Sequence, residues 1–279
     1  MLFKFLPEDR VDVVKNLSIR FSPISSLNDP FEQMPLPYID LHAAQLKAIE
    51  DIEISMMEFW SQTAIKDKTT ENKEILDNGT VELIQNVLCT LSSDNVAVEL
   101  NNLFGDTFGI LSLTRTNRNL LMWSHYASSM SGYVIEFDES NDFFHRPNLL
   151  GESTDPQSVK YSEIRQIPNV SKCGGLDLLC HKPMEWAYEQ EERMFISNMH
   201  SDFKLDEKDS FGNDIYLYPI PKDAIKALYF GFRMKETLKS KLADYVKQND
   251  MKCKMYNSIV TASEYKIAFE PYAQPTTLA

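Results

Sequence analysis

The sequence predicts an α+β protein with a mixed, mostly antiparallel sheet flanked by helices, and with a helical insertion near the N-terminal third. Short segments that are apolar, or that alternate apolar and polar residues as strands do, recur along its 279 residues. Amphipathic helical segments lie between them without the regular strand–helix–strand order of a parallel sheet. The glycine-rich phosphate-binding motifs of Rossmann and P-loop folds are absent, so neither fold is predicted.

The N-terminal segment predicts a strand, a helix, a second strand and a loop. Residues 2–6 are almost wholly apolar, and residues 7–16 begin with Pro and acidic residues, as helices often do. Residues 17–22 alternate apolar and polar side chains, which is typical of a half-buried strand. Prolines and an Asn-Asp-Pro turn predict that residues 23–37 form an ordered loop.

Residues 40–103 predict a helical insertion or subdomain within a single domain of residues 1–279. Apolar side chains recur every three or four positions in residues 41–60 and 80–91, and the connecting residues 66–80 are polar. The simpler interpretation is that these helices pack on the sheet.

The remainder of the chain predicts further strands and two helices. Residues 107–114 are almost wholly apolar, which indicates a central strand. A short helix at 119–127, a turn ending at Gly132 and a strand at 133–138 follow. We also expect a polar connector at 198–214, an amphipathic helix at 235–248, and strands at 158–164, 191–197, 215–220, 225–232, 253–259 and 264–272.

Composition and charge narrow the classes of partner. The formal net charge is −13, which repels phosphates and makes nucleic acid an unlikely partner. No apolar run approaches the roughly 20 residues of a membrane span, and the first residues lack the features of a signal peptide. We therefore expect a cytoplasmic protein without a membrane partner. The four cysteines form no CxxC pair, so neither a disulfide framework nor a zinc site is indicated.

Three clusters carry residues suited to chemistry, and the first is the loop segment LNDPFE, residues 27–32. Its Asn-Asp-Pro turn can be purely structural, because Asn and Asp side chains accept hydrogen bonds from nearby backbone amides. In the functional interpretation, Asp29 and Glu32 project from this loop into a cleft and bind a ligand.

The second cluster places Trp123, His125 and Tyr126 on one short helix. Trp123 shares a helical face with Leu120 and Ala127, and we expect that face to be buried. His125 and Tyr126 can clamp a planar ring such as a nucleobase or nicotinamide. The structural alternative is a hydrogen-bonded histidine beside a core tryptophan.

The third cluster is KPMEWAYEQEERMFI, residues 182–196. If the chain becomes extended near Tyr188, then Glu189, Glu191 and Arg193 share one face of a strand. Neighbouring carboxylates raise one another's pKa unless a cation such as Arg193 compensates. Such a pair can serve acid–base chemistry or stabilise a cationic transition state, and the alternative is a structural ladder of ion pairs.

The order of these clusters resembles a bacterial family known as domain of unknown function 2971. Its motifs are an FNDPFE-like loop, an LSLT…LMWSHYA…G…FD block, a K…W.YE.E.R block and a later FG.R motif. The matching residues here are Leu27 to Glu32, Leu111 to Thr114, Leu121 to Ala127, Gly132, Phe137, Asp138, Lys182, Trp186, Tyr188, Glu189, Glu191, Arg193, Phe230, Gly231 and Arg233. Leu27 departs from the common Phe, and residues 40–103 match no motif. This family name leaves the activity open.

A weaker resemblance is to ADP-ribosyltransferase-like proteins, through the strand–helix–strand start and the Glu-x-Glu of YEQEER. It implies NAD as substrate, with Glu191 stabilising the oxocarbenium-like charge that forms when nicotinamide leaves. Tyr126 or Trp123 would stack on the ring, and Lys4 or Arg20 would hold the pyrophosphate. The sequence departs from that pattern, because Lys4 stands where Arg or His is expected and no Ser-Thr-Ser element is evident.

We therefore expect a nucleotide-handling enzyme of the ADP-ribosyltransferase-like kind, with NAD as its substrate. The alternatives are a non-catalytic ligand-binding or protein-interaction module, or a metal-dependent hydrolase with clustered carboxylates. The predicted catalytic residues are Glu191, Glu189 and His125. The predicted ligand-binding residues are Asp29, Glu32, Trp123, Tyr126, Arg193 and Arg20.

Overall fold

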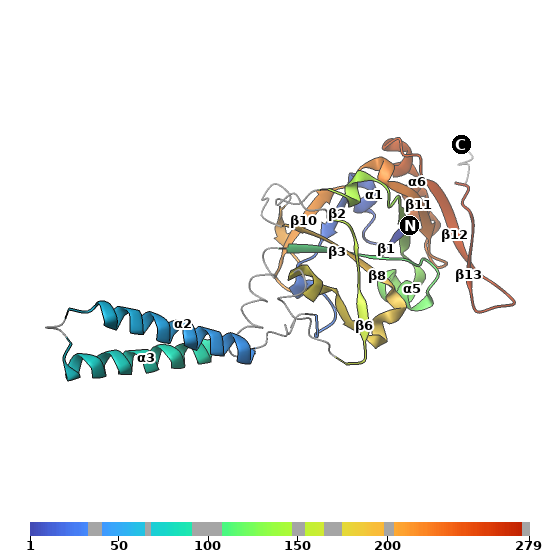
Figure 1. Ribbon diagram of the computed structural model, residues 1–279. Helices are drawn as coiled ribbons and strands as arrows, with labels where there is room; N and C mark the ends of the chain where they lie inside the picture. Colours follow the sequence, from blue (N-terminus) through green and yellow to red (C-terminus); the bar gives the residue numbers. More distant parts are fainter. Residues whose placement is uncertain are drawn as a thin grey trace. The chain divides into compact units, whose positions relative to one another are not determined.

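The computed structural model in Figure 1 describes residues 1–32, 41–64, 68–90, 108–146, 154–164, 175–197 and 204–274. The chain forms two compact units, because most contacts between residues fall within one unit or the other. Each unit is described by itself. The first unit comprises residues 1–32, 105–165 and 180–279, and the second comprises residues 33–104 and 166–179. The second unit includes the predicted helical insertion, whose status as an insertion within one domain stays a prediction.

The largest sheet in the described residues has eight strands. Its order is β13 (Ile267–Pro271), β12 (Lys254–Val260), β11 (Ile225–Phe230), β4 (Tyr133–Phe137), β1 (Leu2–Leu6), β3 (Phe108–Thr114), β8 (Glu191–Ser197) and β5 (Gln157–Ser158). All neighbouring strands are antiparallel except β11 and β12, which are parallel. The predicted α+β class with a mostly antiparallel sheet is therefore confirmed, and the apolar strand β3 does lie in the interior of the sheet.

Two smaller sheets complete the described strands. One contains β2 (Ser18–Phe21), β10 (Asp214–Pro219) and β9 (Lys204–Lys208), and the other pairs β6 (Lys160–Ser162) with β7 (His181–Pro183). Strand β9 falls in the predicted polar connector 198–214, so that prediction is wrong there. All five residues of β9 are exposed, and the strand is defined by its pairing with β10, which leaves no apolar pattern to detect.

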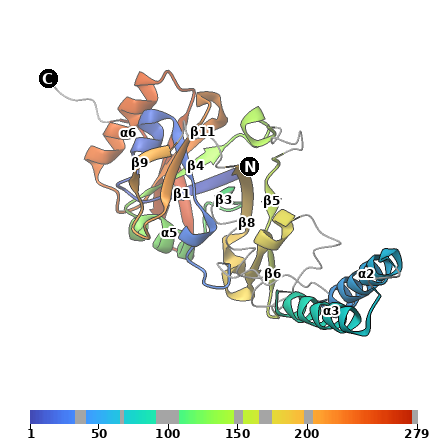
Figure 2. The same ribbon diagram turned by 90° about the vertical axis from the view of Figure 1, so that its left-hand side faces the viewer.

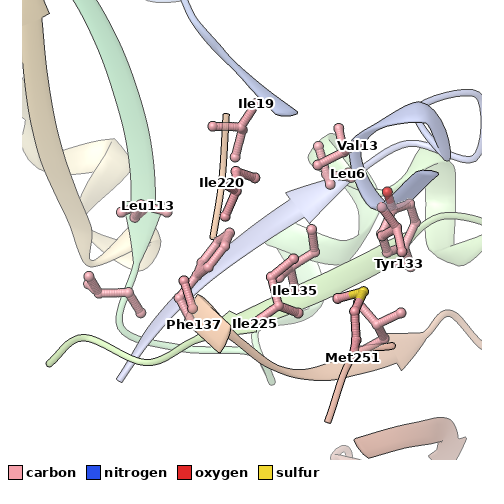
Figure 3. Packing of buried hydrophobic residues seen from close by; sticks show 14 of the residues in the cluster. Leu6, Val13, Ile19, Leu113, Tyr133, Ile135, Phe137, Ile220, Ile225 and Met251 are labelled. Carbon is pink, nitrogen blue, oxygen red and sulfur yellow. The ribbon is translucent and has the colours of Figure 1, made fainter. Parts of the chain in front are cut away.

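Apolar side chains cover both faces of the large sheet. Helices α1 (Asp12–Asn16) and α6 (Glu236–Gln248) pack on one face together with β2 and β10. Figure 3 shows this core, in which Leu6, Val13, Tyr133, Ile135 and Phe137 lie close together. On the opposite face, α5 (Leu120–Tyr126) packs against Phe3, Phe5 and Val134. Because alternate residues of β1 serve both cores, the whole strand is apolar except for Lys4.

Helix α1 is shorter than the predicted helix at residues 7–16. It begins at Asp12 and ends at Asn16, and Leu17 follows in the left-handed conformation with φ of 49°. This turn separates the helix from β2, which begins at Ser18. Figure 2 shows α1 and α6 next to each other, in agreement with their contacts.

The described part of the second unit contains two long helices that lie side by side, α2 (Leu41–Gln62) and α3 (Thr70–Thr90). The polar segment 66–80, expected as a connector, is helical from Thr70 onward. Leu76 and Ile84 are half-buried and are spaced as one face of a helix. An ion pair of 2.7 Å joins Lys73 Nζ to Asp77 Oδ1 one turn apart. No helix among the described residues is long and apolar enough to cross a membrane.

Strands β1 and β3 are neighbours in the sheet, but they diverge. Their register contains one pair, Phe3 with Thr114, whereas β1 and β4 share five pairs and β3 and β8 share seven. At the other end of β3, Ile110 pairs instead with Ser22, which follows β2. The backbone of β3 thus turns from β1 toward β2, and side chains of both strands line the space between them.

Candidate functional site

A cavity of about 220 Å³ lies where β1 and β3 diverge. Its polar lining comes from all three sequence clusters: Asn28 from the loop, Tyr126 from α5, and Lys182, Glu189 and Glu191 from the third cluster. Lys4 and Ser112 line it from the two diverging strands. An apolar cavity of roughly 150 Å³ is large enough to hold benzene. The space therefore suits one substituted ring, surrounded by charged and hydroxyl groups.

Five buried charged side chains form one network at this cavity. Lys182 Nζ lies 2.6 Å from Glu191 Oε2, 2.8 Å from Glu189 Oε2 and 3.6 Å from Glu32 Oε2. Arg193 donates to Glu191 through Nε at 2.9 Å and Nη2 at 3.0 Å, and it also pairs with Glu32. None of the five side chains is more than 7% exposed. Three of the four predicted acidic residues, Glu32, Glu189 and Glu191, are thus brought together by two cations.

Lys182 is the member of this network that the sequence interpretation left out of the predicted site. It belongs to the K…W.YE.E.R block, which was the available signal. Lys182 and Glu189 are seven residues apart, a spacing that does not by itself predict contact. They meet because the residues between them form the 3-10 helix η6 (Met184–Glu189). The return of this helix toward β7 brings the ammonium group between three carboxylates.

The predicted extended chain from Tyr188 onward is wrong in its first residues. Glu189 ends η6, Gln190 is left-handed with φ of 46°, and β8 begins only at Glu191. Glu191 and Arg193 share a strand face as expected, whereas Glu189 reaches the same network from the helix. Thr114 Oγ1 secures this turn by donating to the Glu189 carbonyl oxygen at 2.5 Å.

Two acids of the network, Glu191 and Glu32, differ in protonation behaviour. Burial opposes the charge of Glu191, but the charges and hydrogen bonds of Arg193 and Lys182 outweigh it and lower the pKa to about 2. For Glu32, burial outweighs the same two cations and raises the pKa to about 7. Burial likewise opposes the charge of Lys182, yet Glu191 and Glu32 raise its pKa. At neutral pH, Glu191 is therefore an anion at the cavity wall.

Tyr126 links the loop to the charged network. Its hydroxyl donates to Glu189 Oε1 at 2.5 Å and accepts from Asn28 Nδ2 at 3.0 Å. Burial and the neighbouring Glu189 raise the pKa of the Tyr126 hydroxyl, so it stays protonated and remains a donor. The helix that carries it is capped by Asn119, whose Oδ1 accepts from the amides of Leu121 and Met122. This cap sets the start of α5 and hence the position of Tyr126.

His125, predicted as catalytic, lies outside the cavity lining. Its ring is exposed, and its Nδ1 is 3.0 Å from the hydroxyl of Tyr188. The ring packs edge-to-face against Tyr126 and Tyr188, with centroid distances of 6.1 Å to each. His125 is therefore next to the cavity through Tyr126 and not part of its wall.

In the loop, Asp29 and Glu32 have different roles. Asp29 is 1% exposed, and its Oδ1 accepts from the amide of Phe31 at 2.9 Å, as expected of an Asn-Asp-Pro turn. The amide of Glu32 in turn donates to the Asp29 carbonyl oxygen at 3.1 Å. This turn directs the Glu32 carboxylate to Arg193. Neither acid lines the cavity, so both hold the site together.

Two further predicted ligand-binding residues, Trp123 and Arg20, do not line the cavity, and their assignment stays a prediction. Trp123 is wholly buried; its Nε1 donates to the Asn117 carbonyl oxygen at 2.8 Å, and its ring packs edge-to-face on Phe5. It anchors α5 on the sheet and leaves no face for a ligand. Arg20 Nη2 lies 2.6 Å from Asp209 Oδ2, in an ion pair with a residue far away in the sequence.

Lys4 stands at the point where the strands separate. Its Nζ donates to the Ser112 carbonyl oxygen of β3 at 2.8 Å, which satisfies a backbone group that β1 does not pair. Burial lowers the pKa of this amine to about 8, although Glu191 acts in the opposite direction. Lys4 thus places an ammonium group at the cavity that loses its proton at lower pH than an exposed lysine does.

The carboxylates have side-chain cations as partners. Glu32, Glu189 and Glu191 all contact Lys182 within 4 Å, so its ammonium group occupies the position between them. Within the described ranges, no three His, Cys, Asp or Glu side chains are grouped in a way that could hold a metal ion. The metal-dependent hydrolase considered from the sequence stays a prediction, and a metal ion between these carboxylates would have to displace the Lys182 ammonium group.

Two glycines of the family motifs, Gly132 and Gly231, lie where backbone segments approach each other closely. The amide of Gly231 donates to the Gly132 carbonyl oxygen at 2.9 Å. A Cβ atom on Gly231 would lie 2.1 Å from the Met130 carbonyl oxygen, and one on Gly132 would lie 2.2 Å from the Leu6 carbonyl oxygen. These positions admit only glycine without a shift of the backbone. The motif positions Gly132 and Gly231 are thus explained by the close approach of backbone segments.

Comparison with known proteins finds one match, a family model that covers part of the site. Residues 122–194 match the family model DUF2971, described as a protein of unknown function. The match begins in α5 and ends in β8, so it includes Tyr126 and the four network residues Lys182, Glu189, Glu191 and Arg193. The resemblance to this family is confirmed. No curated protein and no solved structure matches the chain.

Proposed function

We propose that this chain, which carries the DUF2971 signature in residues 122–194, is a nucleotide-handling enzyme that binds NAD and cleaves its nicotinamide–ribose bond. One observation carries the proposal. Glu191, held as an anion by Arg193 and Lys182, lines a cavity of single-ring size next to Glu189. An anion fixed in a partly dry pocket is a binding group for a positively charged ring.

The chemistry of this reaction matches such a pocket. The nicotinamide ring of NAD is a cation, and it leaves with the electron pair of the bond to the ribose C1. The ribose is left with an oxocarbenium-like positive charge, and an acceptor hydroxyl or water then bonds to C1 and releases a proton. Carboxylates placed before the reaction stabilise this developing charge, as they do in glycoside hydrolysis.

The protonation states favour this electrostatic role over proton transfer. An acid with a pKa of about 2, as Glu191 has, is a weak base at neutral pH. Glu189 is oriented by two donors, the Tyr126 hydroxyl and the Lys182 ammonium group. The network contains three carboxylates and two cations, so it is net negative whenever Glu32 is ionised.

Cavity size supports binding of one end of the dinucleotide. A volume of about 220 Å³ suits the nicotinamide ring, and the phosphates then lie beyond it. Lys4 on β1 supplies a positive group at the same cavity, in line with the pyrophosphate role that the ADP-ribosyltransferase-like resemblance implies.

The test is release of nicotinamide from NAD, measured by chromatography, together with the shift in melting temperature on adding NAD. Glu191→Gln should abolish release. Glu192→Gln is the matched control: Glu192 is 4% exposed, next in the chain, and pairs with Arg115 at 2.9 Å on the opposite side of β8. It should retain release. If wild-type protein neither gains stability with NAD nor forms nicotinamide, the proposal is wrong.

A second candidate function, a non-catalytic ligand-binding module, is favoured by the mutual pairing of all five charges. In that case Glu189 and Glu191 serve mainly to hold the cavity walls together. The wild-type protein would then bind a ligand without consuming it. Binding of NAD with no nicotinamide formed over long incubation would select this function over the enzyme.

A further inference from the structure

We propose that four aromatic side chains beside the cavity bind a second planar ring, the purine of the same dinucleotide. They are His125 and Tyr126 of α5 and Trp186 and Tyr188 of η6, here called the aromatic strip. The proposal rests on the proposed function and deepens it, because it assigns the end of the ligand that the cavity cannot hold.

The strip is a continuous row of rings. Centroid distances are 6.1 Å from Tyr126 to His125, 6.1 Å from His125 to Tyr188 and 6.1 Å from Tyr188 to Trp186. Helices α5 and η6 are in contact, so residues far apart in the sequence form the row. Ring spacings of about 4.5–7 Å are those of interacting aromatic side chains.

Two residues connect the strip to the cavity. Tyr126 belongs to both, since it lines the cavity and packs against His125. Lys182, which also lines the cavity, places its Nζ 5.6 Å from the centre of the Trp186 ring. A ligand with one ring in the cavity therefore meets aromatic side chains as soon as it extends beyond it.

The strip is accessible to solvent and already ordered. His125 is exposed and the other three rings are half-buried, in contrast to the wholly buried Trp123. The hydroxyl groups of both tyrosines have hydrogen-bond partners, because Tyr126 donates to Glu189 and Tyr188 contacts His125 Nδ1. Rings held in this way lose little freedom when a ligand stacks on them.

Charge assigns the two ends of the ligand. The cationic ring is attracted to Glu189 and Glu191 in the cavity. Trp186 already has the Lys182 ammonium group over its ring, so a second cation there would be repelled. A neutral purine suits the strip better, and stacking of a nucleobase on an aromatic side chain contributes about 1–3 kcal/mol.

The experiment measures dissociation constants of NAD, AMP and nicotinamide mononucleotide by titration, with tryptophan fluorescence as one readout. Trp186→Ala should weaken binding of NAD and of AMP by roughly tenfold or more. Binding of nicotinamide mononucleotide, which lacks the purine, should be unchanged. Trp186→Phe retains a ring and should restore most of the affinity, while removing the AMP-dependent quenching.

Trp60 offers a matched control, since Lys73 Nζ lies 5.8 Å from its ring centre on the helical pair α2–α3. Trp60→Ala should leave all three affinities unchanged. If Trp186→Ala binds NAD and AMP as the wild type does, or weakens nicotinamide mononucleotide equally, the strip is not a purine site. If AMP binds through Trp186 but NAD is neither bound nor cleaved, the strip stands and the proposed function falls.

Discussion

Replacing Lys182 with Met would remove the cation that lies between three buried carboxylates while keeping the length of the side chain. In the native protein its Nζ lies 2.6 Å from Glu191, 2.8 Å from Glu189 and 3.6 Å from Glu32. Arg193 pairs with two of these acids, Glu191 and Glu32. The substitution therefore leaves Glu189 buried with the Tyr126 hydroxyl as its main donor.

The expected loss of stability follows from these distances and from burial. At an effective dielectric constant of about 20, unit charges 2.8 Å apart attract by about 6 kcal/mol. Desolvation of the charges offsets most of that attraction in a complete network. When one partner is removed, the remaining buried charges are still without water but have lost the attraction that offset this penalty. The free energy of unfolding then typically falls by about 3–5 kcal/mol. That is a large share of the roughly 5–15 kcal/mol that stabilises a folded domain.

The loss should depend on pH in a definite direction. The charge of Lys182 lowers the pKa of Glu32 and of Glu191, so both pKa values rise without it, and the folded variant takes up protons that the wild type does not. Stability then falls as pH rises, because the unfolded chain is the state that binds fewer protons. We expect the difference between variant and wild type to be largest near pH 8 and smaller near pH 5.

Urea unfolding followed by circular dichroism at both pH values measures this difference. The control is Lys226→Met, which breaks an ion pair of 2.9 Å with Asp138 where Lys226 is 49% exposed. Exposed pairs contribute about 1 kcal/mol or less, so this control should unfold nearly as the wild type does. If Lys182→Met lowers the free energy of unfolding no more than the control does, or lowers it equally at pH 5 and pH 8, then Lys182 does not stabilise the fold by neutralising these carboxylates.

Three further predictions concern the anchor of α5, the glycine crossing and Lys4. Trp123→Ala should lower the free energy of unfolding by about 3–5 kcal/mol, measured by urea denaturation, because a wholly buried indole is lost; a smaller cost would mean that it does not anchor α5. Gly231→Ala should cost about 1–3 kcal/mol, since its Cβ would lie 2.1 Å from the Met130 carbonyl oxygen. Gly79→Ala, with nothing within 4 Å on α3, should instead stabilise by up to about 1 kcal/mol; equal effects would contradict the close crossing. Burial lowers the pKa of Lys4 from 10.5 to about 8, so between pH 8 and pH 10.5 the unfolded chain binds more protons than the folded protein. The free energy of unfolding of the wild type, relative to that of Lys4→Met, should therefore rise with pH over this range. If the difference between the two proteins does not change with pH, the Lys4 ammonium group is not buried as described.

Local pattern was enough to predict most strands of the large sheet. The apolar residues of β1 and β3 and the segment that becomes β8 reflect burial on both faces, which leaves a direct trace in the sequence. Strand β9 had no such trace, because all its residues are exposed and only pairing with β10 defines it. The boundary between Glu189 and Glu191 leaves no such pattern either, since one left-handed residue, Gln190, separates helix from strand.

By itself, the sequence determined the α+β class, the family resemblance and the choice of Glu189, Glu191 and Tyr126, because residue type and spacing are properties of the chain. The tertiary structure alone decided the rest. It separated β1 from β3 to open the cavity, placed Lys182 among three acids and paired Arg20 with Asp209. These outcomes depend on contacts between distant segments, and such contacts are selected by the packing of the whole unit, which no local pattern encodes.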